Sequence, residues 1–291
     1  MSRPVYRFAP SPNGRLHLGH AFSALLNQRM AKDTGGRLLL RMEDIDAARC
    51  TPALEAGIYD DLYWLGLEWE QPVRRQSEHF AEYRNALTRL ADMDLVYPAF
   101  LSRGEVRERI GAVLATGNKW PCDPDGTPHY PQGERSLSEK ERMHRIASGA
   151  PYAWRLDMDK ALAQLNDALL WHESGAGPED ETGMIRADPA RWGDVILARK
   201  DTPTSYHLSV VVDDALQGVT HIVRGRDLYH ATAVHRLLQT LLGLPEPQYH
   251  HHTLILAEDG QKLSKSRNDT AFESLRAQRW TPSDIRSKLK L

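Results

Sequence analysis

The sequence predicts an α/β protein built on a doubly wound parallel sheet that an inserted segment interrupts. Strand-like and helix-like patterns alternate along the chain, beginning with residues 5–8, a helix from Leu18 and residues 37–42, which is the order of a β–α–β unit. Two later stretches, 208–212 and 220–223, are nearly continuous apolar runs, as strands buried on both faces of a parallel sheet require. This alternation favours helices on both faces of one sheet.

The first helix follows a loop through which neither a strand nor a helix can continue. Prolines and a glycine within residues 10–14 interrupt both kinds of element. From Leu18 to Met30 the apolar residues recur at helical spacing, and the glycine pair at 35–36 ends the helix. The start of this helix therefore lies at the carboxyl end of the first strand, where ligands gather in such sheets.

The remaining elements are predicted from local signals. Thr51 and Pro52 form a helix start, Ser77 opens another helix, and Asp227 is expected to cap a later one. Further strands are expected at 194–199 and 253–256. The region 97–185 changes character, with several prolines and an acidic loop, and we interpret it as an inserted subdomain.

Composition narrows the class of protein. The chain has 291 residues with 41% hydrophobic content, which is enough for a large core. Its 37 basic and 39 acidic residues give a net charge of −2, so any nucleic-acid contact must use local patches. Two cysteines, Cys50 and Cys122, argue against a disulfide scaffold. With no apolar run of bilayer length and no signal peptide at the start, we expect a cytoplasmic protein without membrane contact.

Two short motifs carry the chemistry. His17-Leu18-Gly19-His20 lies at the expected helix N-terminus, where free N–H groups and the positive end of the dipole attract phosphate, and where imidazoles can donate to charge that develops in a transition state. Lys262-Leu263-Ser264-Lys265-Ser266 follows Gly260 near the other end of the chain. Its two lysines are suited to holding the outer phosphates of ATP.

Together these motifs resemble the paired signature of class I aminoacyl-tRNA synthetases. The longer run from Arg7 to His20, with Arg41-Met42-Glu43-Asp44-Ile45-Asp46, resembles the glutamyl branch. The resemblance extends from Arg7 to Ser266 and implies a Rossmann-like catalytic domain that uses ATP with Mg²⁺. It implies catalytic roles for His17, His20, Lys262 and Lys265, and ATP contacts from these four residues together with Gly19 and Ser264.

The resemblance divides the chain into four segments. Residues 1–96 and 186–245 would be the two halves of the catalytic domain, 97–185 the inserted connective subdomain, and 246–291 a stem-contact region with the lysine motif.

An acidic amino acid presents two carboxylates and one ammonium, so its site needs two cations and one anion. The chain supplies suitable groups at predicted strand ends. By similarity to glutamyl-tRNA synthetases, Arg7 and Arg224 would bind the carboxylates of L-glutamate and Glu43 the ammonium. Tyr206 and Ser11 would bind the remaining oxygens. Either arginine alone could equally form a structural salt bridge, and which arginine holds which carboxylate stays open.

Small chains of this type usually carry zinc in the insertion, bound by a Cys-x-Cys pair and a later Tyr-x-x-x-Cys. Here the pair falls on Ala99 and Leu101, and Glu134 follows Tyr130 at the last position. With Cys122 and His129 this is a poor ligand set, so we predict no zinc. Apolar packing around Phe100, Leu101 and Trp120 would replace the metal. The histidine run at 250–252 is expected to be a polar surface loop.

Only 25 residues follow Ser266, which leaves no room for an anticodon-binding domain. This truncated form resembles glutamyl-Q tRNA(Asp) synthetases, which activate glutamate and esterify it onto queuosine in the anticodon of tRNA(Asp). The alternatives are a minimal synthetase that charges a tRNA acceptor end and an inactive synthetase-like binding protein. The expected partners are L-glutamate, ATP and queuosine-containing tRNA(Asp), and the chain is expected to be a monomer.

Overall fold

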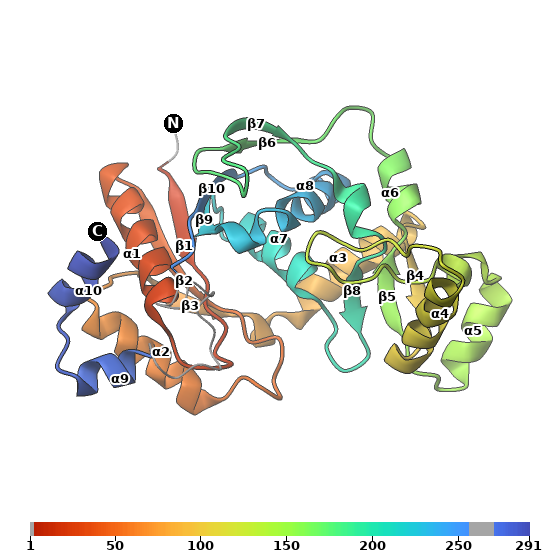
Figure 1. The fold of residues 1–291 in the computed structure, drawn as a ribbon, viewed down its shortest axis with the longest axis horizontal. Coiled ribbons are helices and arrows are strands. Elements are labelled where there is room, and N and C mark those ends of the chain that lie inside the picture. Colours follow the sequence, from red (N-terminus) through yellow and green to blue (C-terminus); the bar gives the residue numbers. More distant parts are fainter. Residues whose placement is uncertain (1–2, 256–270) are drawn as a thin grey trace.

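Figure 1 shows a computed structural model of the chain, which describes residues 3–255 and 271–291. Its centre is a seven-stranded sheet with the strand order β3-β2-β1-β9-β10-β6-β7, in which all neighbours run parallel except β6 and β7. These strands are β1 (Val5–Phe8), β2 (Arg37–Met42), β3 (Glu70–Arg75), β6 (Leu170–Glu173), β7 (Gly183–Arg186), β9 (His221–Gly225) and β10 (Gln248–His252). The mainly parallel α/β sheet predicted from the sequence is confirmed.

A second, antiparallel sheet has the order β4-β5-β8 and lies at the opposite end of the molecule from α1 (Figure 1). Its strands are β4 (Val96–Ala99), β5 (Ala153–Leu156) and β8 (Ile196–Arg199). The pairing of strands does not follow the expected segment boundaries. β6 and β7 fall within 97–185 but extend the large sheet, whereas β8 falls within 186–245 but completes the small one.

Two helices begin where the local signals place them, but Ser77 opens no α-helix, because it lies in the 3₁₀ turn Gln76–Glu78 and the next α-helix begins at Phe80 after His79. α1 is capped by His17, and α2 is capped by Thr51 with proline in its first turn. The α-helices are α1 (Leu18–Asp33), α2 (Pro52–Trp64), α3 (Phe80–Asp92), α4 (Arg103–Ala115), α5 (Glu139–Ala147), α6 (Met158–Ala163), α7 (Tyr206–Leu216), α8 (Ala231–Leu241), α9 (Phe272–Ala277) and α10 (Pro282–Leu289). Short 3₁₀ turns occupy Gln76–Glu78, Gln132–Ser136, Pro189–Trp192 and Arg226–Leu228.

Three further predictions about helices and strands differ from the structure. Residues 208–212 lie inside helix α7 and do not form a strand. The strand placed at 253–256 is wrong in position, because β10 covers 248–252 and residues 253–255 belong to no element. Asp227 does not cap α8; it lies in a 3₁₀ turn, and His230 is the residue before the helix.

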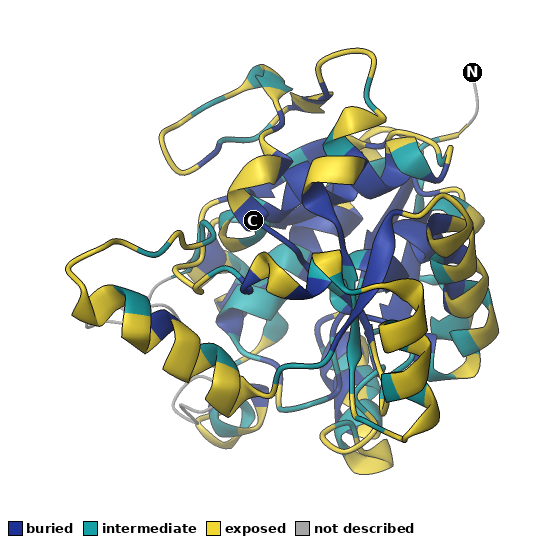
Figure 2. Cartoon of the chain, turned by 90° about the vertical axis from the view of Figure 1, so that its right-hand side faces the viewer, coloured by how far each residue is buried: buried dark blue, intermediate teal, exposed yellow. Residues whose placement is uncertain are grey.

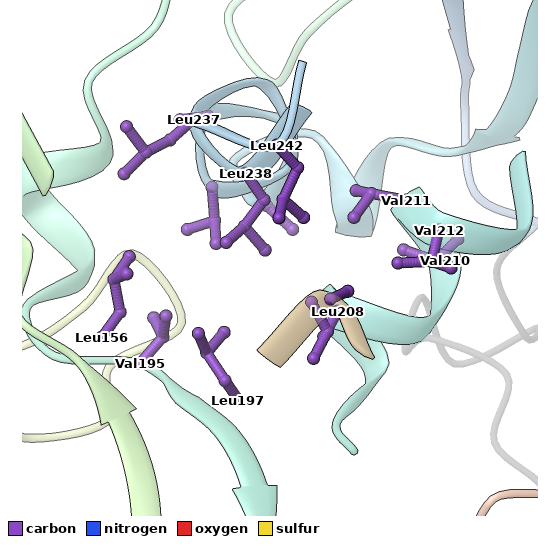
Figure 3. Close-up of a cluster of buried hydrophobic side chains, with 14 of the residues drawn as sticks. Leu156, Val195, Leu197, Leu208, Val210, Val211, Val212, Leu237, Leu238 and Leu242 are labelled. Atoms are coloured by element: carbon purple, nitrogen blue, oxygen red, sulfur yellow. The ribbon is translucent and has the colours of Figure 1, made fainter. Parts of the chain in front are cut away.

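The core joins both sheets. One apolar cluster unites Leu197 of β8 and Leu156 of β5 with Leu208 of α7 and Leu238 of α8 (Figure 3). Figure 2 shows the buried strands enclosed by helices whose outer faces are exposed. The small sheet therefore packs continuously onto the α7–α8 layer and does not hang from a linker. No helix in the described ranges 3–255 and 271–291 is long and apolar enough to cross a membrane.

Candidate active site

A cavity of about 430 Å³ lies at the carboxyl ends of β1, β2 and β9, bounded by the N-termini of α1 and α7. The residues that line it come from segments far apart in the sequence. Among them are eight of the predicted site residues: Arg7, Ser11, His17, Gly19, His20, Glu43, Tyr206 and Arg224. The expected imidazole pair and the expected amino-acid contacts therefore share one cavity, in the position that a doubly wound sheet reserves for ligands.

The histidine pair is built into the first turn of α1. The Nδ1 atom of His17 accepts the backbone N–H of Gly19 at 3.1 Å, and the Nδ1 atom of His20 accepts the backbone N–H of His17 at 3.1 Å. Because each Nδ1 is an acceptor, the proton of each neutral ring is on Nε2. The two ring centroids are 3.8 Å apart. The capping geometry thus fixes both tautomers, with the proton of each neutral ring on Nε2.

Gly19 lies against the ring of His17. A Cβ atom at this position would be 3.0 Å from Cε1 and 3.1 Å from Nδ1 of His17, which is tighter than ordinary contact. A side chain here would require the imidazole to shift by a few tenths of an ångström. Gly19 therefore serves the placement of His17, in addition to offering a surface without a side chain to a ligand.

Lys262, Ser264 and Lys265 lie outside the described residues. The chain on either side of them is at the cavity: Leu254 and Ile255 line it, and Ala271 forms a bridge with His17. The described residues that flank 256–270 in the sequence thus lie at the cavity on one side and at His17 on the other.

Arg7 is held in position by the buried carboxylate of Asp214, on α7. Its Nε donates to Asp214 at 3.0 Å, and Arg41 Nη1 donates to the same oxygen at 2.8 Å. Burial alone would raise the pKa of Asp214, but the two guanidiniums hold this pKa below its ordinary value. Asp214 is the one hydrogen-bond partner of Arg7 in the described part of the chain. The Nη groups of Arg7 are therefore the donors that a ligand in the cavity can use.

Glu43 provides the anion of the cavity. Its backbone N–H donates to Pro10 at 3.0 Å, which joins the ends of β1 and β2, and its carboxylate accepts from Arg41 at 3.3 Å. Burial raises the pKa of Glu43 against the opposing effect of Arg41 and Arg7. Ser11 lines the same wall and lies 3.8 Å from the sulfur of Cys50. Asp44, the next residue, accepts the backbone N–H and the hydroxyl of Ser77.

Arg224 differs from Arg7 in that all five N–H groups of its guanidinium donate hydrogen bonds to other groups of the protein. Nε, Nη1 and Nη2 each donate to buried groups on β10, α7, α8 and the turn after β9. The acceptors are His251 Nε2 at 3.1 Å, Tyr206 Oη at 3.3 Å, His235 Nδ1 at 3.2 Å, the Leu228 carbonyl at 3.1 Å and Thr232 Oγ1 at 2.8 Å. A ligand carboxylate can therefore bind Arg224 directly by displacing one of these acceptors, or bind to an acceptor that is itself hydrogen-bonded to Arg224.

Tyr206 is the acceptor through which the cavity reaches Arg224. Its hydrogen bond to Arg224 is the longest of the five. Of the five acceptor residues, only Tyr206 and Leu228 line the cavity, and Tyr206 alone of these two accepts through its side chain. Burial raises the pKa of Tyr206, so the hydroxyl keeps its proton. It can accept from Arg224 and donate to a ligand oxygen at the same time.

Sequence reasoning missed the buried groups behind the cavity. Asp213 and Asp214 sit on α7, where Asp213 accepts from Arg74 at 2.7 Å and from the Tyr83 hydroxyl at 2.9 Å. The available signal was the apolar spacing of α7, with Leu208 followed by apolar residues at helical intervals.

The histidine run at 250–252 is not a surface loop. It forms most of β10, where His251 and His252 are 1% and 8% exposed. The reason is pairing: the Nδ1 atom of His251 lies 2.5 Å from Glu173, so this polar side chain is satisfied inside the sheet. Sequence alone gave no partner for these imidazoles, because Glu173 lies 78 residues away.

The region where related chains bind zinc is held by a carboxylate. Glu134 is 4% exposed and accepts the backbone N–H of Phe100 at 2.8 Å and of Leu101 at 3.3 Å, as well as the hydroxyl of Tyr130. Hydrogen bonds to Glu134 therefore act here together with apolar packing, because Leu101 also packs against a cluster of Tyr97, Ala99 and Tyr130. Trp120 does not join this cluster; its indole donates to the His129 carbonyl.

The donor set in this region does not fit zinc. Cys122 is exposed, and the Glu134 carboxylate is already occupied by N–H and O–H donors. Within residues 3–255 and 271–291, no group of three or more histidine, cysteine or acidic side chains could hold a metal ion.

The parallel sheet thus carries the start of α1 and a cavity with two arginines at its strand ends, which is the arrangement implied by the resemblance to class I aminoacyl-tRNA synthetases. More specifically, the chain belongs to the family described as tRNA synthetases class I (E and Q), catalytic domain, which matches residues 5–289.

Individual relatives agree with this family. The chain is 47% identical to the glutamyl-Q tRNA(Asp) synthetase of Rhodobacter capsulatus over 99% of this chain and 100% of that protein. It is 35% identical to glutamate–tRNA ligase 2 of a Methylobacterium species, over 98% of this chain but 59% of that relative. The solved glutamate tRNA ligase of Elizabethkingia meningosepticum, in complex with its amino acid, superposes with a TM-score of 0.75 at 28% identity, over 92% of this chain and 53% of that one.

Proposed function

We propose that this chain activates L-glutamate with MgATP to form glutamyl-adenylate and transfers the glutamate to queuosine in the anticodon of tRNA(Asp). The observation that carries the proposal is the cavity itself, in which two guanidiniums and a carboxylate lie beside the imidazole pair of α1. The 47% identity with a glutamyl-Q tRNA(Asp) synthetase over the full length of both chains supports the choice of RNA substrate.

The amino acid fits the charges of the cavity. The Nη groups of Arg7 and the Tyr206 hydroxyl backed by Arg224 would receive the two carboxylates, and Glu43 the ammonium, with Ser11 binding a further oxygen. Arg41 and Arg7 are the positive charges that act on partly buried Glu43, and a bound ammonium would add a third. Glutamine in place of glutamate would leave one buried cation without its partner, at a cost of about 1–3 kcal/mol.

ATP would bind along the N-terminus of α1. The Nε2–H groups of His17 and His20 would donate to phosphate oxygens, and Gly19 would let the nucleotide approach the backbone. Lys262, Ser264 and Lys265 are assigned to the outer phosphates, because the described residues that flank their segment lie at this cavity and at His17.

The reaction would proceed in two transfers without a covalent enzyme intermediate. A glutamate carboxylate oxygen attacks the α-phosphorus of MgATP, the bond to the bridging oxygen breaks, and pyrophosphate leaves. A hydroxyl of queuosine then attacks the activated carbonyl, and AMP leaves. The side chains contribute orientation and stabilisation of the charge on the phosphates.

Incubation with ATP, labelled glutamate and tRNA(Asp) tests the RNA substrate. We expect label on tRNA(Asp) that carries queuosine and none on the same tRNA prepared without it. Equal labelling of both would contradict the proposal and favour charging of an acceptor end, which the 35% identity to a glutamate–tRNA ligase keeps as the second candidate. Glutamate-dependent ATP–pyrophosphate exchange without RNA would exclude an inactive binding protein.

Three further properties belong to the same proposal. We infer a monomer that works in the cytoplasm and a C-terminal stem-contact region at 246–291. We also infer a catalytic domain divided as 1–96 and 186–245 around the insertion 97–185, with the insertion lending β6 and β7 to the large sheet and receiving β8 into the small one. We also infer activity without zinc, because Glu134 ties the loop that thiolates would otherwise cross-link.

A further inference from the structure

Arg224, His251 and Glu173 lie in a row across three neighbouring strands. β9 and β10 run parallel with Arg224 opposite His251, and β6 lies on the other side of β10 with Glu173 opposite Tyr249. The three side chains are 5%, 1% and 1% exposed. A carboxylate that the sequence places within 97–185 is thereby joined through β10 to a guanidinium at the cavity.

The hydrogen-bond directions in this row are fixed by chemistry. The Nε of Arg224 can only donate, so the Nε2 of His251 accepts, at 3.1 Å. The proton of His251 is therefore on Nδ1, which lies 2.5 Å from Glu173 and donates to it. Burial lowers the pKa of His251 to about 4. Burial would raise the pKa of Glu173, but the hydrogen bonds from His251 bring it to about 2.

A second imidazole pair holds the other side of the guanidinium. The Nδ1 of His235 accepts from Arg224 Nη1 at 3.2 Å, so its proton is on Nε2, which donates to Nδ1 of His207 at 3.2 Å. Burial keeps both imidazoles neutral and lowers the pKa of His207 to about 4. Neutral rings orient the guanidinium without adding a competing positive charge.

The interposed histidine also preserves the charge of Arg224. Arg7 forms a direct ion pair with Asp214, whereas Arg224 has no direct carboxylate partner within the described ranges. Glu173 lies one imidazole away, so it fixes the row of hydrogen bonds without neutralising the cation. An anion that enters the cavity therefore meets a guanidinium that is oriented and still uncompensated.

We propose that Glu173 and His251 are positioning residues for glutamate recognition, acting through Arg224 and its partner Tyr206. The inference rests on the proposed function, since it assigns the anion as a glutamate carboxylate. Its consequence is specific: loss of the row should weaken glutamate binding and leave ATP binding unchanged.

Steady-state ATP–pyrophosphate exchange with varied glutamate and varied ATP tests this. His251→Leu removes the acceptor for Arg224 at similar volume and should raise the KM for glutamate at least about tenfold, with the KM for ATP within about twofold of wild type. His251→Gln restores an acceptor oxygen and should recover most of the loss. Glu173→Gln should raise the KM for glutamate in the same sense. His172→Gln, on an exposed neighbour in β6, is the control and should match wild type.

A wild-type KM for glutamate in folded His251→Leu would overturn the inference, as would an equal rise in both KM values. If His251→Leu does not fold, Glu173→Gln decides between the same two outcomes, with its Tm recorded alongside. No exchange by the wild-type chain would overturn the proposed function and the inference with it. Exchange by the wild type together with unchanged variants would overturn the inference alone.

Discussion

His17 has two roles at one position, and two substitutions separate them. Its Nδ1 caps α1 by accepting the backbone N–H of Gly19. His17→Ala removes this cap, which costs about 1 kcal/mol of unfolding free energy. Asparagine is among the best N-cap residues, so His17→Asn should keep the stability within about 0.5 kcal/mol of wild type.

The catalytic effect of the two substitutions should be equal. Asparagine has no donor at the position of the Nε2–H of His17, a residue that lines the cavity. A hydrogen bond to a charged group contributes about 1.5–3 kcal/mol, so both variants should lose roughly 10- to 150-fold in the rate of glutamate activation. Stability should separate the variants, and activity should not.

Two measurements check this. For a chain of 291 residues, a loss of about 1 kcal/mol lowers the Tm by roughly 2 °C, so the thermal unfolding of both variants must be compared in replicate. ATP–pyrophosphate exchange at saturating glutamate gives the rate. A wild-type rate for His17→Asn would refute the role of the imidazole in chemistry. Equal Tm values for His17→Ala and wild type would refute the capping argument.

Lys265→Ala should slow activation at least about tenfold, or roughly 1.4 kcal/mol of barrier, and a wild-type exchange rate would contradict its assignment to phosphate. ATP–pyrophosphate exchange should persist after chelation and washing when Mg²⁺ alone is restored. Exchange that returns only when zinc is added would contradict the prediction of activity without zinc. Glu134→Ala leaves the Phe100 N–H and the Tyr130 hydroxyl without this acceptor and should cost about 1–3 kcal/mol of unfolding free energy, read from urea titrations. Folding lowers the pKa of His207 and His251 from 6.5 to about 4, so the unfolded chain takes up protons that the folded chain does not. The urea midpoint should therefore be highest above pH 6.5 and fall as the pH drops toward 4, and equal midpoints at pH 7.5 and 5 would contradict this.

The first β–α–β unit could be predicted because its signals are local. Prolines and a glycine mark the loop, and the spacing after Leu18 specifies the helix without reference to the rest of the chain. The same holds for Thr51 with Pro52. The cavity could be located for a related reason, since parallel strands direct their carboxyl ends to one edge and the chemistry-bearing residues follow those ends.

Buried polar residues could not be placed in this way. His251 and Glu134 look like surface residues in the sequence, because a polar side chain is buried only when a partner meets it there. The partners are distant: Glu173 is 78 residues from His251, and Phe100 is 34 from Glu134. The zinc reasoning shows the same gap, since it found Glu134 where a thiolate was expected but did not predict that this carboxylate is buried and accepts the N–H groups of Phe100 and Leu101.

The helix α7 shows how one local error changes the electrostatics of a site. A β-branched run such as Val210–Val211–Val212 fits a strand, and only burial on all sides of α7 by α3, α8 and β8 makes the helix the better structure. In a strand, Asp213 and Asp214 would point to opposite faces, and at most one could reach the arginines. In the helix both carboxylates reach buried guanidiniums, Asp213 that of Arg74 and Asp214 that of Arg7. Arg7, which faces the cavity from β1, therefore shares the Asp214 carboxylate with Arg41, whereas Arg224 has no direct carboxylate partner among the described residues.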